Sequence, residues 1–239
     1  MKKYLAVASA LVMGGSAVLA TTITPNYDTF GSLPAATFGG TGIPNDAVAQ
    51  TTISGLNQNQ DNSIALALSA TQRYSNPTVG NNGAGTFFAT TGENNGLDGA
   101  SPAHALGPTW NFDFYINIVD PTGAGYHLGL LYGNNTTGTS KILDFGSLTA
   151  GTYQDSWNLD MSFLSGIGFD PNANSVYGFE LTLLNADGRP VGDDVAINVD
   201  VTGGAQTPDT ASTAMLLGCG FIGLALVGRR QMRLATVAK

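Results

Sequence analysis

Cysteine and histidine are scarce in this chain of 239 residues, and a serine-hydrolase motif is absent. The single cysteine, Cys219, excludes an intramolecular disulfide. The two histidines, His104 and His127, lack the i, i+4 spacing of a helical zinc site. No serine stands in the Gly-x-Ser-x-Gly frame of a hydrolase nucleophile. These absences argue against an enzyme, and no cofactor is expected.

Basic residues are almost missing from the middle of the chain. Of the nine lysines and arginines, only Arg73, Lys141 and Arg189 lie between residues 21 and 206, whereas all 17 acidic residues except Asp209 do, so the formal charge of this region is 3 − 16 = −13. A polyanion would be repelled and would find no basic stripe, so nucleic acid is excluded as a partner. The charge also keeps the domain soluble.

The C-terminal region 207–239 combines an uncharged run with a basic end. Residues 212–228 carry no charge and, as a helix, would be roughly 26 Å long, near the lower limit for crossing a bilayer. The basic tail 229–239 follows, and its arginines would remain in the cytoplasm. We therefore expect a transmembrane helix over about 212–228 with the carboxyl end inside.

The order of features in this tail resembles the PEP-CTERM sorting signal of exosortase-processed bacterial proteins, in the variant that begins Val-Pro-Asp. The matching residues are Pro208, Asp209, Ser212, Thr213, Arg229, Arg230 and Arg233. The resemblance implies that an exosortase-type transpeptidase cuts the chain near 208–213 and passes it to the cell surface. The alternative is a plain tail anchor without processing.

The N-terminal residues 1–20 have the pattern of a signal peptide. Lys2 and Lys3 precede a mostly apolar run over 4–13, and residues 18–20 form a signal-peptidase site. We expect signal peptidase to cut after Ala20. An uncleaved anchor is less favoured because the apolar run is short. The chain would then be an inner-membrane precursor that moves to the surface or matrix of a Gram-negative-type bacterium.

Alternating side chains predict that the region 21–206 is one all-β domain. The strongest segment is 110–119, WNFDFYINIV, in which large apolar residues fall on one face and polar ones mostly on the other. Further strands are expected at 63–75, 86–90, 126–132, 141–147, 177–184 and 195–201, and 157–164 is ambiguous between a strand and a helical turn. About seven to nine strands predict an antiparallel β-sandwich or jelly roll.

The same region resembles a recurring group of secreted proteins that carry PEP-CTERM signals. The segments concerned are 30–49, 69–89, 110–118 and 154–159. No activity is attached to that group, so the resemblance implies the class of secreted protein and its location but no chemistry.

Two candidate binding features remain. Asp170, Asn172 and Asn174 place oxygen ligands on alternate residues, as a calcium loop does, although an ordinary Asx-rich turn would look the same and an EF-hand is excluded. Tyr115, Tyr153 and Trp157 are candidates for stacking on sugars. The alternative for these rings is packing in the core.

The sequence therefore predicts a non-enzymatic exported protein of the cell surface or extracellular matrix, with a structural role or an association with the polysaccharide of a biofilm. A carbohydrate-binding module is the first alternative. A secreted hydrolase is the second, and the absence of a nucleophile motif counts against it.

Overall fold

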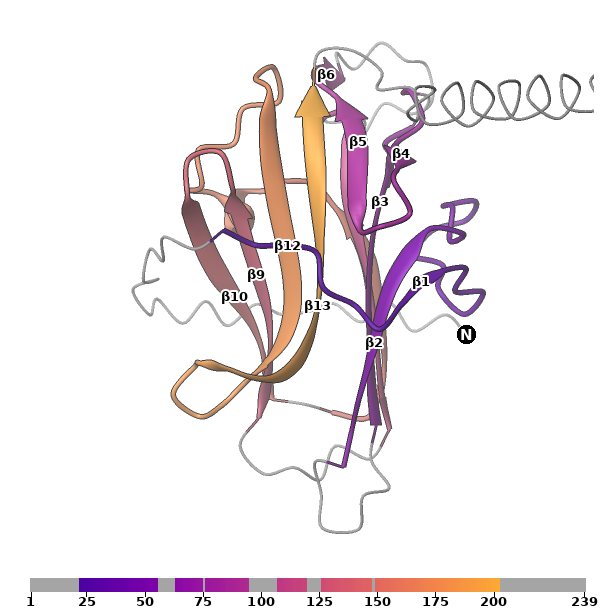
Figure 1. The fold of residues 1–239 in the computed structure, drawn as a ribbon, viewed down its shortest axis with the longest axis vertical. Helices are drawn as coiled ribbons and strands as arrows, with labels where there is room; N and C mark the ends of the chain where they lie inside the picture. The colour runs from indigo at the N-terminus through magenta and orange to yellow at the C-terminus, as the bar shows by residue number, and fades with distance from the viewer. Residues whose placement is uncertain are drawn as a thin grey trace, which may run out of the picture.

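The computed structural model describes residues 22–55, 63–74, 76–94, 107–119, 126–147 and 149–202. In these residues the protein is all-β, with two large sheets and one small pair of strands (Figure 1). The predicted fold class is confirmed at this level. The expected signal peptide and C-terminal helix lie outside the described residues.

The first sheet has five antiparallel strands in the order β1-β2-β3-β8-β11. Their bounds are β1 Thr29–Gly31, β2 Val48–Ser54, β3 Ser63–Gln72, β8 Trp110–Val119 and β11 Gly151–Trp157. β3 is the central strand, and it pairs along its whole length with β8, from Ser63 opposite Val119 to Gln72 opposite Trp110. Its pairing with β2 is shorter, so one end of β3 extends past its neighbour.

The second sheet has six strands in the order β10-β9-β12-β13-β5-β4. Their bounds are β10 Thr139–Ser147, β9 His127–Asn134, β12 Ser175–Leu184, β13 Pro190–Thr202, β5 Thr86–Thr90 and β4 Gly80–Asn81. β6 (Glu93–Asn94) pairs separately with β7 (Gly107–Pro108). One pair in the six-stranded sheet, β13 with β5, is parallel, which departs from the fully antiparallel expectation.

The core lies between the two sheets and is rich in aromatic rings. The apolar face predicted for 110–119 contributes Trp110, Phe112 and Phe114, all almost fully buried. Phe112 stacks on Phe179 of β12 with ring centroids 4.2 Å apart, and Trp110 lies 5.9 Å from the ring of Tyr177. Because these contacts join β8 to β12, the alternating residues of the two strands form the layer that holds the sheets together.

The ambiguous segment 157–164 contains both of the expected structures in succession. β11 ends at Trp157, and a 3-10 turn, η1, covers Ser162–Leu164. The Asn158 carbonyl accepts the Met161 N–H and the Met161 carbonyl accepts the Leu164 N–H, so local turns replace the ladder. Leu159 is buried and Met161 packs against the core, so part of the alternating pattern continues beyond the strand, whereas Phe163 is 45% exposed.

The N-terminal strap, residues 22–28, covers the outer face of the six-stranded sheet (Figure 1). The Asn135 side chain accepts a hydrogen bond from the Ile23 N–H at 3.0 Å and donates one to the Ile23 carbonyl at 2.7 Å. Ile23 is 1% exposed and packs with Leu131 and Ala196. A Cβ on Gly178 would lie 2.5 Å from the Ile23 Cβ, so glycine at this position makes room for the strap.

The segment before β2 covers part of the outer face of the five-stranded sheet. Ala36, Phe38 and Val48 form a second apolar cluster with Ala67 and Tyr115. The Gln154 side chain of β11 fixes this segment, because its oxygen accepts the N–H groups of residues 37 and 38 at 2.8 and 2.9 Å. Both sheets are therefore partly covered on their outer faces by chain that precedes β2.

Candidate functional site

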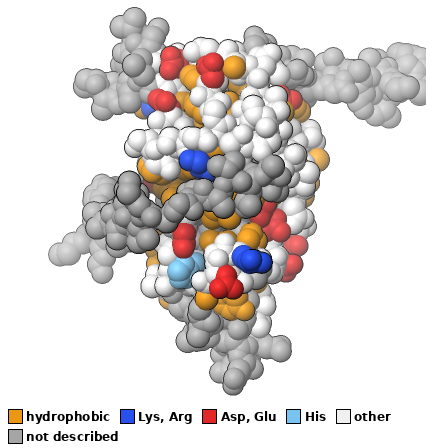
Figure 2. All heavy atoms as spheres, turned by 90° about the vertical axis from the view of Figure 1, so that its left-hand side faces the viewer, with side chains coloured by type: hydrophobic (Ala, Val, Ile, Leu, Met, Phe, Trp, Pro, Cys, Tyr) orange, Lys and Arg blue, Asp and Glu red, His pale blue; other side chains and the backbone are white. Residues whose placement is uncertain are grey.

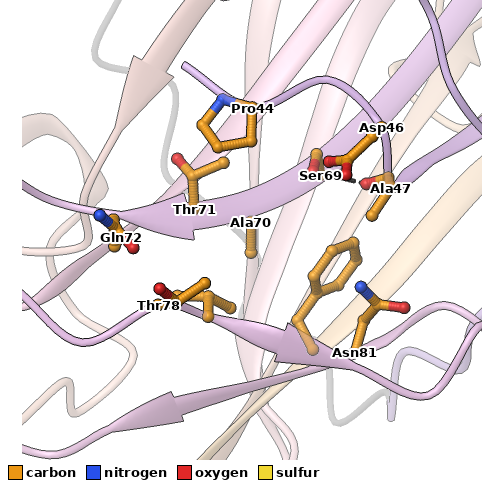
Figure 3. Close-up of a pocket in the computed structure, with 11 residues that line it drawn as sticks. Pro44, Asp46, Ala47, Ser69, Ala70, Thr71, Gln72, Thr78 and Asn81 are labelled. Atoms are coloured by element: carbon orange, nitrogen blue, oxygen red, sulfur yellow. Dashed lines mark hydrogen bonds between the residues drawn. The ribbon is translucent and has the colours of Figure 1, made fainter. Parts of the chain in front are cut away.

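A pocket of about 290 Å³ lies where β3 extends beyond β2. One wall is formed by residues 69–72 of β3, and the opposite wall by Thr78, Val79 and Asn81 near β4. The segment 44–47, which leads into β2, closes a third side. Figure 3 shows the labelled side chains gathered around this opening from three separate parts of the chain.

The end of β3 gives the pocket unpaired backbone groups. Arg73 donates its N–H to the Thr109 carbonyl at 2.8 Å, which continues the pairing of β3 with β8. Because hydrogen-bonding groups alternate in direction along a strand, the odd-numbered residues of β3 point their backbone N–H and C=O groups toward β8. The backbone N–H and C=O groups of the even-numbered Ala70 and Gln72 therefore point the other way, toward the pocket. The register between β2 and β3 stops at Ala49 opposite Leu68, and these groups have no backbone partner among the described residues. The pocket thus presents two N–H donors and two C=O acceptors.

The chain leading into β2 cannot close this gap. The same register, if continued, would place Asn45 opposite Gln72, but the Asn45 carbonyl accepts the Leu33 N–H at 2.9 Å. The Ala47 carbonyl is bonded by the Ser69 hydroxyl at 2.7 Å, so a side chain of β3 takes the place of a backbone bond. The opening beside Ala70 and Gln72 is therefore maintained by local structure.

The pocket combines uncharged polar groups with an apolar floor. Thr71, Gln72 and Thr78 contribute hydroxyl and amide groups, while Phe87 of β5 is 1% exposed and forms apolar lining. Among the described residues, Asp46 is the one charged side chain that lines it, and no lysine or arginine does. An anion would therefore find no counter-charge in the pocket.

A buried carboxylate lies beside this pocket on the outer face of the five-stranded sheet. Asp113 of β8 stands opposite Ser69 on one side and Ser156 on the other, and it is 0% exposed. Neither of its carboxylate oxygens has a hydrogen-bond partner. The Thr71 and Ser156 hydroxyls lie near enough to influence it but do not bond it in regular geometry.

Burial raises the pKa of Asp113 from its usual 3.8 to about 7. The hydroxyls of Ser156 and Thr71 lower it in part, and the negative charge of Asp155 raises it further. Asp113 is consequently a mixture of protonated and ionised forms near neutral pH. Glu180, on the opposite sheet, also has its pKa raised to about 7, mainly by burial and in part by Asp194.

The three aromatic residues predicted to stack on sugars do not form one exposed platform. Tyr115 is 8% exposed because the segment before β2 covers it, so the expectation of an exposed ring is wrong there. Trp157 packs edge-on against Phe114 at 4.7 Å and Phe163 at 5.0 Å between ring centroids, which places it at the margin of the core. Tyr153 is half-buried and bonded to Thr149.

The candidate calcium residues lie in a turn between η1 and β12. Asp170 and Asn172 are linked by a hydrogen bond of 2.9 Å from the Asn172 N–H to the Asp170 Oδ1, which is an Asx turn. Asn174 is exposed, directly before β12. Within the described ranges no cluster of three or more His, Cys, Asp or Glu is arranged to hold a metal. A calcium-dependent rise in melting temperature that disappears in Asp170→Asn would support the site, and no shift at millimolar calcium would end the hypothesis.

The residues of the sorting signal and the cleavage site at Ala20 lie outside the described residues. These are Pro208, Asp209, Ser212, Thr213, Arg229, Arg230 and Arg233. Among the residues that the structure does describe, no helix is long and apolar enough to cross a membrane. The expected span 212–228 lies outside these residues.

Sequence reasoning missed both the pocket and the buried Asp113. The alternation of 110–119 placed Asp113 on the polar face but gave no sign that this face would be covered. The mixture of Ser, Thr and Gln at the end of β3, residues 69–72, was a weak signal, since polar residues of these types also occur at ordinary strand ends.

The chain has no match among protein-family models, curated proteins or solved structures.

Proposed function

We propose that this protein is exported by a bacterium and becomes a structural or polysaccharide-associated component of its surface or extracellular matrix, without a catalytic step of its own. Signal peptidase would remove residues 1–20, and a transmembrane helix over about 212–228 would hold the precursor in the inner membrane. An exosortase-type transpeptidase would then cut near Pro208 to Thr213. The mature β domain would pass to the cell surface of a Gram-negative-type organism.

The observation that carries this proposal is the order of features in the tail: proline and acid, Ser-Thr, an uncharged run, then arginines. The described strands are compatible with it, because they run from β1 at Thr29 to the end of β13 at Thr202, between the two expected cuts. Only residues 203–207 separate the end of β13 from Pro208. Such a spacer would keep the domain near the membrane until release.

The charge distribution also supports an extracellular matrix location. Residues 21–206 carry the formal charge of −13 and contain three bases. Figure 2 shows acidic side chains scattered among uncharged ones on the face that includes the β10 edge, with few basic side chains. A surface of this kind stays dispersed and avoids nucleic acid and anionic lipid headgroups.

The test is the intact mass of the protein recovered from the envelope and the medium of its native host. We expect a mass that begins at Thr21 and ends between Pro208 and Thr213, with or without an added glycan or lipid. A mass that still contains residues 216–239 would contradict the processing step and leave a tail-anchored domain.

A further inference from the structure

We propose that the pocket beside the end of β3 binds one residue of an uncharged sugar chain. The inference rests on the proposed function, because it identifies the chemistry by which the domain would associate with a polysaccharide. It differs from the aromatic platform expected from the sequence, since the pocket contains neither Tyr115, Tyr153 nor Trp157.

The unpaired backbone groups set the first requirement for a ligand. Ala70 is 4% exposed, so its N–H and C=O, directed at the pocket, have little access to bulk water. A ligand must therefore both donate and accept hydrogen bonds within a short distance. A sugar hydroxyl does both, and a pyranose presents several of them side by side.

The side chains around the opening set the second requirement. Gln72 and Thr78 approach from opposite walls and offer an amide and a hydroxyl, and neither group has a hydrogen bond to another described residue. Asp46 can accept from a hydroxyl pair. Since no described base lines the pocket and the region 21–206 is strongly acidic, uronic acids and phosphorylated sugars are disfavoured.

The size of the pocket limits the ligand to a compact one. At about 290 Å³ it is near the lower end of ligand pockets, which suits a single sugar ring at or near a chain end. An extended peptide could also use the edge of β3, but only Ala70 and Gln72 direct groups there. That edge is shorter than the usual strand of about five residues, so strand addition would gain little.

The floor of the pocket supplies the apolar contact that a sugar ring needs. Ala70, Val79 and Phe87 lie among the polar groups and present carbon atoms to the opening. The C–H face of a pyranose can pack on such a surface while its hydroxyls reach the rim. This combination distinguishes a sugar from a small, fully polar solute.

The experiment uses the full chain, purified in lauryldimethylamine oxide, because a maltoside detergent would itself offer sugars. The probes are the methyl glycosides of glucose, galactose, mannose and N-acetylglucosamine, with methyl glucuronide as the anionic control. Saturation-transfer NMR detects binding, and calorimetric titration gives the dissociation constant. We expect at least one uncharged glycoside to bind with a millimolar dissociation constant and the glucuronide to bind at least tenfold more weakly.

A double variant, Gln72→Leu with Thr78→Val, removes two polar groups from the pocket with little change of volume. We expect it to weaken binding about tenfold or more, since each lost hydrogen bond accounts for roughly fivefold. The matched control makes the same two replacements on β2, as Gln50→Leu with Thr52→Val, outside the pocket. Melting temperatures of both variants show whether the fold is retained.

Failure to bind any uncharged glycoside at millimolar concentration overturns the inference. Equal binding of the glucuronide, or an equal loss in the control variant, overturns it too. Binding of a five-residue Val-Thr peptide in place of every sugar would assign the edge of β3 to strand addition. None of these results bears on whether the tail is cut, so a correct processed mass with no sugar binding would leave the export proposal intact.

Discussion

At the scale of single residues, the most unusual group is the carboxylate of Asp113. Its burial without a hydrogen-bond partner makes the ionised form costly in the folded state. The pKa of the Asp113 carboxyl is near the usual 3.8 in the unfolded chain and about 7 in the folded protein. The stability associated with this group is therefore fully present below about pH 3.8 and is lost as the pH rises through 7.

Replacing this residue, as Asp113→Asn, should flatten the dependence of stability on pH. The variant should gain on the order of 2–4 kcal/mol relative to the parent at pH 8, and little or nothing at pH 4. Urea denaturation at the two pH values measures the difference. Glu180 titrates in the same window, so some slope will remain. The matched control is Asp155→Asn at the exposed neighbour, and an equal effect there would contradict the assignment to burial.

The Trp157 ring offers a second test at this scale, because the structure makes it a packing residue. It contacts Phe112, Phe114 and Phe145 within the aromatic cluster. We expect Trp157→Ala to lower the free energy of unfolding by about 3–5 kcal/mol. Any loss of polysaccharide retention in this variant should then parallel the loss of fold. Phe163→Ala is the control, since that ring is 45% exposed and should cost far less. Retention lost with unchanged stability would instead restore Trp157 as a sugar contact.

At the scale of elements, the alternation of apolar and polar residues predicted where strands form far better than it predicted which strands pair with one another. The pattern of 110–119 gives β8 with its actual bounds, because five large apolar residues on one face require a covering layer. Nothing in the pattern of Val195 to Val201 indicates that β13 pairs in parallel with β5, since that choice depends on contacts between distant segments. The pocket could not be predicted for the same reason, because four separate segments line it: 44–47, 69–72, 78–81 and Phe87 of β5.

The N-terminal strap is an element whose role was also hidden from the sequence, because the glycines and prolines of 21–50 indicate only an irregular lead-in with short strands. Ile23 fills the space above Gly178, and Asn135 fixes its backbone on both sides. We expect Ile23→Ala to destabilise the protein by about 2–4 kcal/mol, measured by urea denaturation. Thr22→Ala, at an exposed neighbour, should change stability by less than about 0.5 kcal/mol. A cost for Ile23→Ala as small as that of Thr22→Ala would show that the strap contributes little to the fold.

At the scale of the whole molecule, folding and sorting should be separable, because the last described strand ends at Thr202 and the proposed signal begins at Pro208. In the native host, the double variant Pro208→Ala with Asp209→Ala should retain the tail through residue 239. Its intact mass should therefore exceed that of the processed parent by the full C-terminal segment. Since no side chain of the β domain changes, its urea midpoint should match the parent's.

Gln206→Ala, in the spacer just before the signal, is the matched control and should be processed as the parent is. If the double variant were cut like the parent, the Pro-Asp pair would not direct processing, and the resemblance to the sorting signal would lose its main support. If Gln206→Ala blocked cutting as well, the spacer would have to be part of what the transpeptidase recognises. The short stretch after β13 would then be recognised by the transpeptidase, in addition to linking the β domain to the signal.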